Sequence, residues 1–259
     1  MELRFDITLA TDYRSGSQIA RVLTEAWVKE HMFCPRCGQS HIERLPNNCP
    51  VADFYCSVCK NEYELKSKNG GWTHKVTDGA YDTMLRRIMS NKNPDFFFMN
   101  YSKKEWMVTD CMFIPKHFFV PSIIEKRKPL ADSSRRARWV GCNILIDQIP
   151  MQGRIFIISN GIAVPTETVL EKVHHSSTLE IQDINARGWL MDVLHCVDLI
   201  PDQSFSLADI YEFEKSLCKK HPKNRHIKAK IRQQLQILRD RGIIEFSGSG
   251  HHKKRKFAS

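Results

Sequence analysis

The chain has 259 residues, of which 42% are hydrophobic, so it suits one large domain or one domain with a smaller appendage. No apolar run approaches the length of a membrane span, and the first residues lack the basic and apolar regions of a signal peptide. The net charge is +10, and nine cysteines, an odd number, argue for a reducing compartment. We therefore expect a cytoplasmic protein with no membrane partner.

The first predicted element is an amphipathic helix from Ser17 to His31. Its apolar stripe recurs at helical spacing and consists of Ile19, Val22, Leu23, Ala26 and Trp27. Glu25 lies on the polar side of this helix. We interpret it as a solvated acid, with a contribution to a metal site as the alternative.

Four cysteines follow in two pairs, each with two residues between its members. The pairs are Cys34 with Cys37 and Cys56 with Cys59, and eighteen residues separate them. This double spacing predicts a zinc ribbon, and four thiolates indicate a structural rather than a catalytic Zn²⁺. The alternatives are four buried free cysteines or a redox pair. Cys49 lies between the two cysteine pairs, has no paired cysteine of its own, and is not counted among the zinc ligands.

Two short β-favouring segments carry a possible catalytic set beside the second cysteine pair. The predicted strands are Val51–Tyr55 and Tyr63–Lys66. Alternation places Glu64 and Lys66 on one face and Leu65 on the other, and a turn at the cysteines can bring Asp53 near Glu64. Converging carboxylates suit Mg²⁺, and Lys66 can orient or deprotonate a water and stabilise charge on a phosphate. The alternative is an exposed hairpin with a solvated ion pair.

The rest of the first half alternates between helix and strand patterns. We expect a helix over Asp78–Asn91, followed by strands over Asp95–Met99, Trp106–Val108, Trp139–Ile146 and Arg154–Ser159. This order predicts a mixed α/β sheet covered by helices. Residues 160–182 are poorly patterned and are expected to contain a domain connection.

A basic loop precedes Trp139, with Arg135, Arg136 and Arg138 close together. Such a loop can grip phosphates while the tryptophan stacks on a base. Equally, Trp139 can begin the next strand as part of the core, with solvated arginines.

The last third predicts three helices and a basic hairpin. Gly188–Leu199 is a hydrophobic helix, and Ser206 with Asp209 resembles a capping box at the start of the next. A third helix, from about Arg225 to Arg241, has an apolar stripe of Ile227, Ile231, Leu235 and Leu238. Its opposite face carries Arg225, Ala229, Arg232, Gln233 and Gln236. Gly242 ends this helix, a strand over Ile243–Phe246 follows, and a basic arm returns.

The basic excess of the chain is confined to this last segment. Residues 219–259 hold 13 Lys and Arg against Asp240 and Glu245, or +11, which leaves −1 for the preceding 218 residues. Three helices, a basic hairpin and this charge predict a winged helix that binds DNA through the arginine and glutamine face. The alternative is that this face meets the first domain or only water.

The chain resembles the DpnI-like methyl-directed restriction endonucleases, which belong to the PD-(D/E)xK nucleases. The resemblance is carried by several blocks along the chain: Pro50–Cys56, Glu64–Lys68, Asp78–Tyr81, Arg135–Arg136, Trp139, Gly141–Asn143, Arg187–Trp189, His226–Lys228 and Ile231–Gln236. It implies a PD-(D/E)xK mixed sheet with an inserted zinc ribbon over residues 1–182 and a winged helix over residues 183–259.

The same resemblance implies cleavage of double-stranded DNA at GATC sites whose adenine is N6-methylated. Asp53 and Glu64 would hold Mg²⁺ with help from the Leu65 carbonyl, and Lys66 would act on the attacking water. The proline of the motif is displaced, since Ala52 precedes Asp53. We expect a monomer in which Trp139 reads methylation separately from the winged helix. Competing hypotheses are a non-catalytic zinc and winged-helix regulator, and a related nuclease acting on other DNA.

Overall fold

The computed structural model describes residues 1–46, 52–71, 73–248 and 250–255, which form two compact units. The first comprises Met1–Val76, Lys92–Lys116 and Gln152–Ser177. The second comprises Thr77–Asn91, His117–Met151 and Thr178–Ser259. The predicted boundary between residues 182 and 183 falls inside the second unit and stays a prediction.

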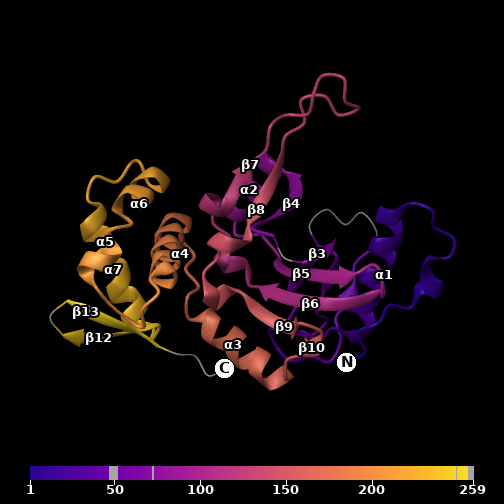
Figure 1. Ribbon diagram of the computed structural model, residues 1–259, viewed down its shortest axis with the longest axis horizontal. Helices are drawn as coiled ribbons and strands as arrows, with labels where there is room; N and C mark the ends of the chain where they lie inside the picture. The colour runs from indigo at the N-terminus through magenta and orange to yellow at the C-terminus, as the bar shows by residue number, and fades with distance from the viewer. Residues whose placement is uncertain (47–51, 72, 249, 256–259) are drawn as a thin grey trace. The chain divides into compact units, whose positions relative to one another are not determined.

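A seven-stranded mixed sheet forms the centre of the first unit (Figure 1). The strand order is β1-β2-β3-β5-β6-β9-β10, and only β3 and β5 run parallel. The strands are β1 (Glu43–Arg44), β2 (Phe54–Tyr55), β3 (Glu62–Asn69), β5 (Asp95–Ser102), β6 (Met107–Ile114), β9 (Ile155–Ser159) and β10 (Ile162–Ala163). The predicted mixed sheet is confirmed, although β2 is shorter than expected, and Val51 lies outside the described residues.

Two helices contribute to the hydrophobic core of this sheet. Helix α1 (Gly16–His31) confirms the first predicted helix, and its Trp27 and Val28 join the core cluster with Phe97 of β5. Helix α3 (Thr166–Ser177) contributes Val169 and Val173 to the same cluster. The sequence interpretation missed α3 because few apolar residues mark its buried side, which also includes a serine. A short 3-10 helix, η1 (Ile7–Ala10), precedes α1.

The second unit begins with a small sheet and one helix. Strands β4 (Lys75–Ala80), β8 (Gly141–Leu145) and β7 (Ile124–Lys126) lie in the order β4-β8-β7, and α2 (Tyr81–Met89) contacts β7 and β8. Residues 78–80 therefore end a strand rather than open the predicted helix. Their exposure alternates along β4, while the helical burial of Met84 and Ile88 begins only after Tyr81. Short 3-10 helices connect these elements: η2 (Lys116–Phe118), η3 (Pro121–Ile123), η4 (Ile146–Gln148) and η5 (Met151–Gly153).

The C-terminal part of the second unit is a winged helix. Its helices are α4 (Ile184–Leu199), α5 (Leu207–Tyr211), α6 (Glu214–Lys220) and α7 (Ile227–Asp240), with a three-stranded sheet of β11 (Ser204–Ser206), β13 (His251–Lys254) and β12 (Ile244–Gly248) in that order. The predicted capping box is present, since Ser206 and Asp209 exchange side-chain and backbone hydrogen bonds at the start of α5. Gly242 follows α7 with a φ of +72°, which suits glycine.

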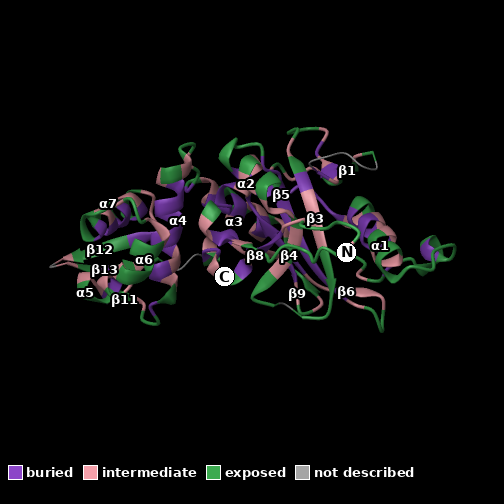
Figure 2. Ribbon diagram, turned by 90° about the horizontal axis from the view of Figure 1, so that it is seen from above, coloured by how far each residue is buried: buried purple, intermediate pink, exposed green. Residues whose placement is uncertain are grey.

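Helix α4 is buried along most of its length (Figure 2). A helix that is apolar on nearly all sides belongs in an interior rather than on a surface. No helix in the described ranges is both long and apolar enough to cross a membrane.

Candidate functional site

The four predicted zinc ligands converge at one point of the first unit. The Sγ atoms of Cys34, Cys37, Cys56 and Cys59 all lie within 4.8 Å of one another. The Cys34–Cys59 and Cys37–Cys56 sulfur distances are both 3.6 Å. Tetrahedral coordination with Zn–S bonds of about 2.3 Å places sulfurs roughly 3.8 Å apart, so the donor set fits Zn²⁺. Cys49 lies outside the described residues.

Protonation at this cluster is set by burial and by backbone donors. Burial raises the pKa of the Cys56 thiol, but hydrogen bonds from the backbone N–H groups of Cys59 and Val58, together with those of the Cys37 and Cys59 thiols, lower that pKa to about 7. Burial also raises the pKa of the Tyr63 hydroxyl, which therefore stays protonated. Its Oη lies 2.9 Å from Cys34 Sγ, and the protonated hydroxyl can donate to that sulfur when Cys34 is a thiolate. A donor to a thiolate is the kind of neighbour that stabilises a metal ligand.

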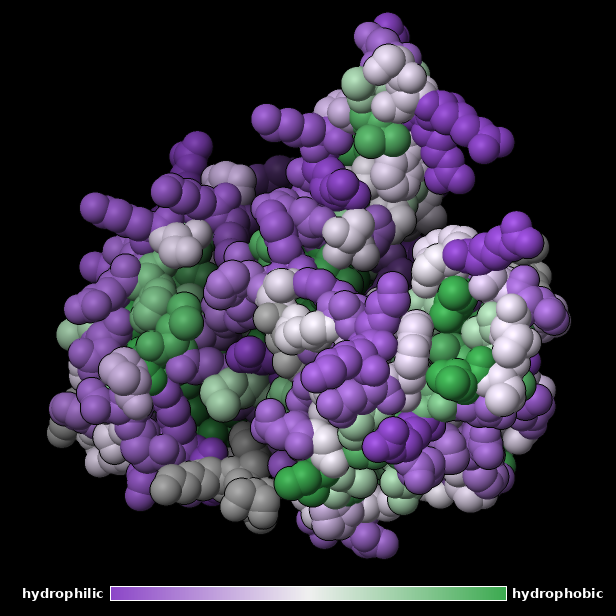
Figure 3. Space-filling view, turned by 45° about the vertical axis from the view of Figure 1, so that its right-hand side comes forward, coloured by the Kyte–Doolittle hydropathy of each residue, from purple (hydrophilic) through white to green (hydrophobic). Residues whose placement is uncertain are grey.

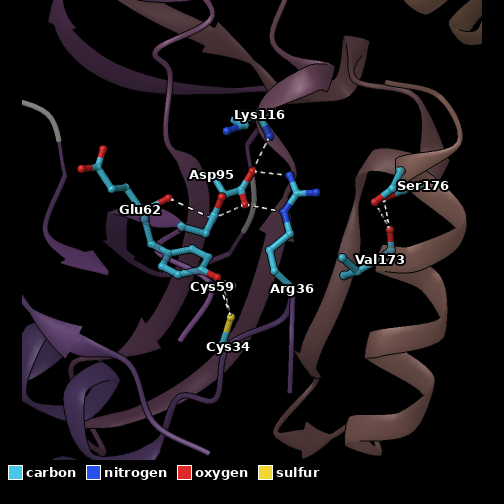
Figure 4. A network of polar contacts seen from close by, with 11 residues as sticks. Cys34, Arg36, Cys59, Glu62, Asp95, Lys116, Val173 and Ser176 are labelled. Carbon is cyan, nitrogen blue, oxygen red and sulfur yellow. Dashed lines mark hydrogen bonds and ion pairs between the residues drawn. The ribbon is translucent and has the colours of Figure 1, made fainter. Parts of the chain in front are cut away.

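A buried carboxylate ties both cysteine knuckles to the central sheet (Figure 4). Asp95, the first residue of β5, is fully buried. It accepts two hydrogen bonds from Arg36, at 2.7 and 2.8 Å, and one from Asn61 at 2.6 Å. The backbone N–H of Lys116 donates a fourth, at 2.7 Å. Since Arg36 lies in the first knuckle and Asn61 follows the second, Asp95 fixes both to β5.

The predicted acid-x-lysine lies on β3, beside β5. Leu65 packs against the core, while the half-buried Glu64 and Lys66 lie on the other face, as the alternation predicts. Lys66 Nζ lies 2.5 Å from Glu64 Oε1. Asp53 precedes β2, and its Oδ2 accepts a hydrogen bond of 2.8 Å from the Leu65 N–H. Asp53 therefore lies beside the strand that carries Glu64.

These groups are hard oxygen donors of the kind that bind Mg²⁺. The Leu65 N–H holds only one carboxylate oxygen of Asp53, and within the described part of the chain no donor contacts Oδ1. Together with the Glu64 carboxylate this gives two acidic groups next to one lysine ammonium. The donor set fits a divalent cation that prefers oxygen.

Glu25 of α1 is a third carboxylate in this neighbourhood, and the sequence interpretation misjudged it. It is buried rather than solvated. It forms an ion pair with Arg44 of β1, and Arg21 lies 3.8 Å away. Burial raises the pKa of Glu25, the two arginines lower it, and the charge of Asp53 raises it further. The sequence did contain an indication that Glu25 is buried, because it lies between Leu23 and Trp27, which belong to the apolar stripe of the helix.

The predicted DNA-reading face lies on α7, where the apolar stripe Ile227, Ile231, Leu235 and Leu238 is buried. The opposite side chains, Arg225, Ala229, Arg232, Gln233 and Gln236, are exposed. Helix α7 begins two residues later than predicted, so Arg225 lies in the preceding turn. Arg232 donates to the Tyr211 hydroxyl at 2.8 Å, which orients its guanidinium.

The predicted basic loop with Arg135, Arg136 and Arg138 joins β7 to β8 and projects from the small sheet (Figure 1). In Figure 3, hydrophilic side chains cover much of the face in view, with hydrophobic patches between them. Arg138 forms an ion pair with Asp132 at 3.2 Å, and both side chains are largely exposed. Trp139 is half-buried and precedes β8 rather than starting it. A Cβ on Gly141 would lie 2.8 Å from the Trp139 ring, so only glycine lets the ring lie there. Arg135 and Arg136 are exposed.

Two protein-family models match this chain in succession. A model described as the Dam-replacing family, DpnI, matches residues 1–182. A model described as the Dam-replacing HTH domain matches residues 185–254. With the mixed sheet and winged helix already described, these matches define a DNA-binding restriction nuclease. The chain belongs to the Dam-replacing family, as the blocks of residues from Pro50 to Gln236 indicated.

Proposed function

We propose that this protein is a restriction endonuclease that hydrolyses double-stranded DNA at GATC sites carrying N6-methyladenine. The observation that carries the proposal is the set on β3: Glu64 paired with Lys66, and Asp53 held by the Leu65 N–H. A regulator that only binds DNA has no need of this arrangement. Membership of the Dam-replacing family supports the substrate and the methyl dependence.

In this proposal Asp53, Glu64 and the Leu65 carbonyl would hold Mg²⁺, and the ion when bound would supply Lewis acidity at the scissile phosphate. The Leu65 N–H fixes Asp53, so its free oxygen keeps one orientation. Lys66 Nζ is held in position by Glu64. From there it orients the attacking water and stabilises the negative charge that develops on the phosphate. Water adds to phosphorus and one phosphodiester P–O bond breaks; the attacking water gives up a proton to solvent, and the departing oxygen takes one up to leave as a hydroxyl group.

We assign a structural Zn²⁺ to Cys34, Cys37, Cys56 and Cys59. Four thiolates leave no open coordination position for a substrate. The ion would hold the hairpin tip, and Asp95 would transmit that order to β5, which pairs with the Glu64 strand. Zinc thus acts on catalysis through the position of β3.

Methyl recognition needs more than one contact. Burying one methyl group contributes only about 0.8 kcal/mol, a few-fold in affinity. We therefore propose that two regions test the site. The α7 face, through Arg225, Arg232, Gln233 and Gln236, reads base edges in the major groove. Trp139 offers a separate aromatic surface for a methylated base.

One experiment tests the proposal directly. Plasmid DNA from an adenine-methylating host and from a non-methylating host is incubated with the protein, with and without Mg²⁺. We expect discrete fragments only from methylated DNA with Mg²⁺. Cutting of both plasmids would favour a related nuclease without methyl dependence. Binding without cutting would favour a non-catalytic zinc and winged-helix regulator.

A further inference from the structure

A cavity of about 1110 Å³ lies within the second unit, and the carboxylates and cysteines of the proposed metal sites are not part of its lining. One wall is α4, with Asn185, Gly188 and Trp189 facing the space. The other is the segment Lys220–His226, which joins α6 to α7. The lining is completed by Met89, Pro121, Ser122, Ile184 and Asp192.

Hydrogen bonds and ring stacking fix the inner wall. Asp192 of α4 is only 2% exposed. It accepts hydrogen bonds from Lys220 Nζ at 2.8 Å, from Ser122 Oγ at 2.9 Å and from His221 Nε2 at 2.9 Å. The His221 ring stacks on Trp189 at a centroid distance of 3.8 Å. These contacts hold the segment before α7 against α4.

The charges that line this cavity do not cancel. Asp192 is the single carboxylate in the lining, and Lys220 already pairs with it. Lys223 and Arg225 also line the space, are exposed, and have no acidic partner among the described residues. One carboxylate against three cations leaves the concave lining with a net positive charge, and because Arg225 is already assigned to base edges, Lys223 is the cation left for a ligand in the cavity. Such a surface is suited to an anion.

The place of the cavity indicates which anion. Residues 223–226 lead directly into α7, whose exposed face carries Arg232 and Gln233. When a recognition helix enters the major groove, its first residues approach the bases, and neighbouring segments lie against the sugar–phosphate backbone.

We propose that this cavity binds a backbone phosphate of the DNA flanking the recognition site, with Lys223 as its principal cation. The inference rests on the proposed function and deepens it. It gives the winged helix a contact that is independent of sequence and methylation, and that sets the register of α7 on the duplex.

The test uses the full chain in Mg²⁺-free buffer, so that DNA binds without being cut. The dissociation constant is measured across a range of NaCl concentrations for methylated, unmethylated and unrelated duplexes. For Lys223→Ala we expect the slope of log K against log [salt] to shrink by about 0.9, the value for one lost phosphate contact. Affinity should fall several-fold and equally for all three duplexes.

Two further variants make the test specific. Lys219→Ala removes the same charge from an exposed residue of α6 that does not line the cavity, and it should leave the slope unchanged. Asn185→Glu adds a negative charge at the rim and should also weaken binding to all duplexes. Because Asn185 is in the first turn of α4, a glutamate there favours the helix and does not unfold it.

An unchanged slope in Lys223→Ala, or an equal change in Lys219→Ala, would overturn the cavity assignment while leaving the nuclease proposal intact. Stabilisation of the wild type against heat by millimolar inorganic phosphate, with no slope change in Lys223→Ala, would assign the cavity to a free anion instead. If the wild type bound no duplex at all, both this inference and the proposed function would fail.

Discussion

Replacing Asp95 with asparagine removes one negative charge while nearly preserving the shape of a buried side chain. All four groups that contact Asp95 are donors: two from Arg36, one from Asn61 and the backbone N–H of Lys116. Each carboxylate oxygen accepts two of them. Whichever oxygen becomes an amide nitrogen therefore loses two hydrogen bonds and faces two N–H groups.

The expected cost follows from the burial of the pair. Asp95 is fully buried, and the Arg36 side chain is 16% exposed. Removing one partner of such a pair leaves an uncompensated charge and costs about 3–5 kcal/mol. For a domain of this size that corresponds to a fall in melting temperature on the order of 10 °C.

Denaturant unfolding of the Asp95→Asn variant measures this cost, and a chromogenic zinc chelator reports how fast the metal leaves. We expect faster zinc release, because Arg36 and Asn61 belong to the two knuckles. The matched control is Asp132→Asn, which breaks the exposed pair with Arg138 and should cost less than about 1 kcal/mol.

A double-mutant cycle with Arg36→Met tests the cause. Once the buried arginine is gone, Asp95→Asn should cost less than it does alone, since the charge–charge attraction between Asp95 and Arg36 has already been removed. A cost for Asp95→Asn below about 1 kcal/mol, or strict additivity with Arg36→Met, would refute the reasoning.

Four other outcomes are expected. The proposed catalytic residues are Asp53, Glu64 and Lys66. Alanine at any one of them should abolish cleavage in a gel assay yet leave duplex binding largely intact. Retained Mg²⁺-dependent cutting would remove that residue from the mechanism. Metal analysis should find one zinc per chain, and Cys34→Ser or Cys56→Ser should misfold the first unit; active protein without zinc would contradict this. Gln236→Ala should lower discrimination between GATC and altered sites by about 1–3 kcal/mol in competition binding, whereas an equal loss on all sequences would indicate a phosphate contact. The raised pKa of Glu25 means that its stabilising contribution is present below the ordinary value of 4.5 and is lost as pH rises through the raised pKa. The unfolding free energy of the wild type minus that of Glu25→Gln should therefore fall as pH rises from the ordinary pKa of Glu through the raised pKa of Glu25. A difference that rises with pH would show that the pKa of Glu25 is lowered instead.

Several features could be predicted because they depend on residues close together in the chain. Two residues between cysteines suffice to turn both sulfurs toward one ion. A period of two along β3 suffices to separate Glu64 and Lys66 from Leu65. The capping box at Ser206 and the buried stripe of α7 also act within a turn or two of helix. Local geometry was therefore enough to predict the four-cysteine cluster, the placement of the acid-x-lysine on β3 and the exposed face of α7; the DNA-reading role of that face stays a prediction.

Other features depend on partners that are distant in sequence, and only tertiary packing decided them. The sequence predicts Asp95 only as the first residue of a core strand. No neighbouring residue indicates that its partner is Arg36, which lies 59 residues away in the chain. The sequence predicts Glu25 to be a solvated acid. It is buried because α1 packs beside the sheet, where Glu25 forms an ion pair with Arg44. The cavity beside Asp192 exists because α4 meets the segment before α7, with Lys220 and His221 drawn to a buried carboxylate. A buried charge needs a partner, but its sequence position does not say which one. That choice is made by the packing that removes water around it.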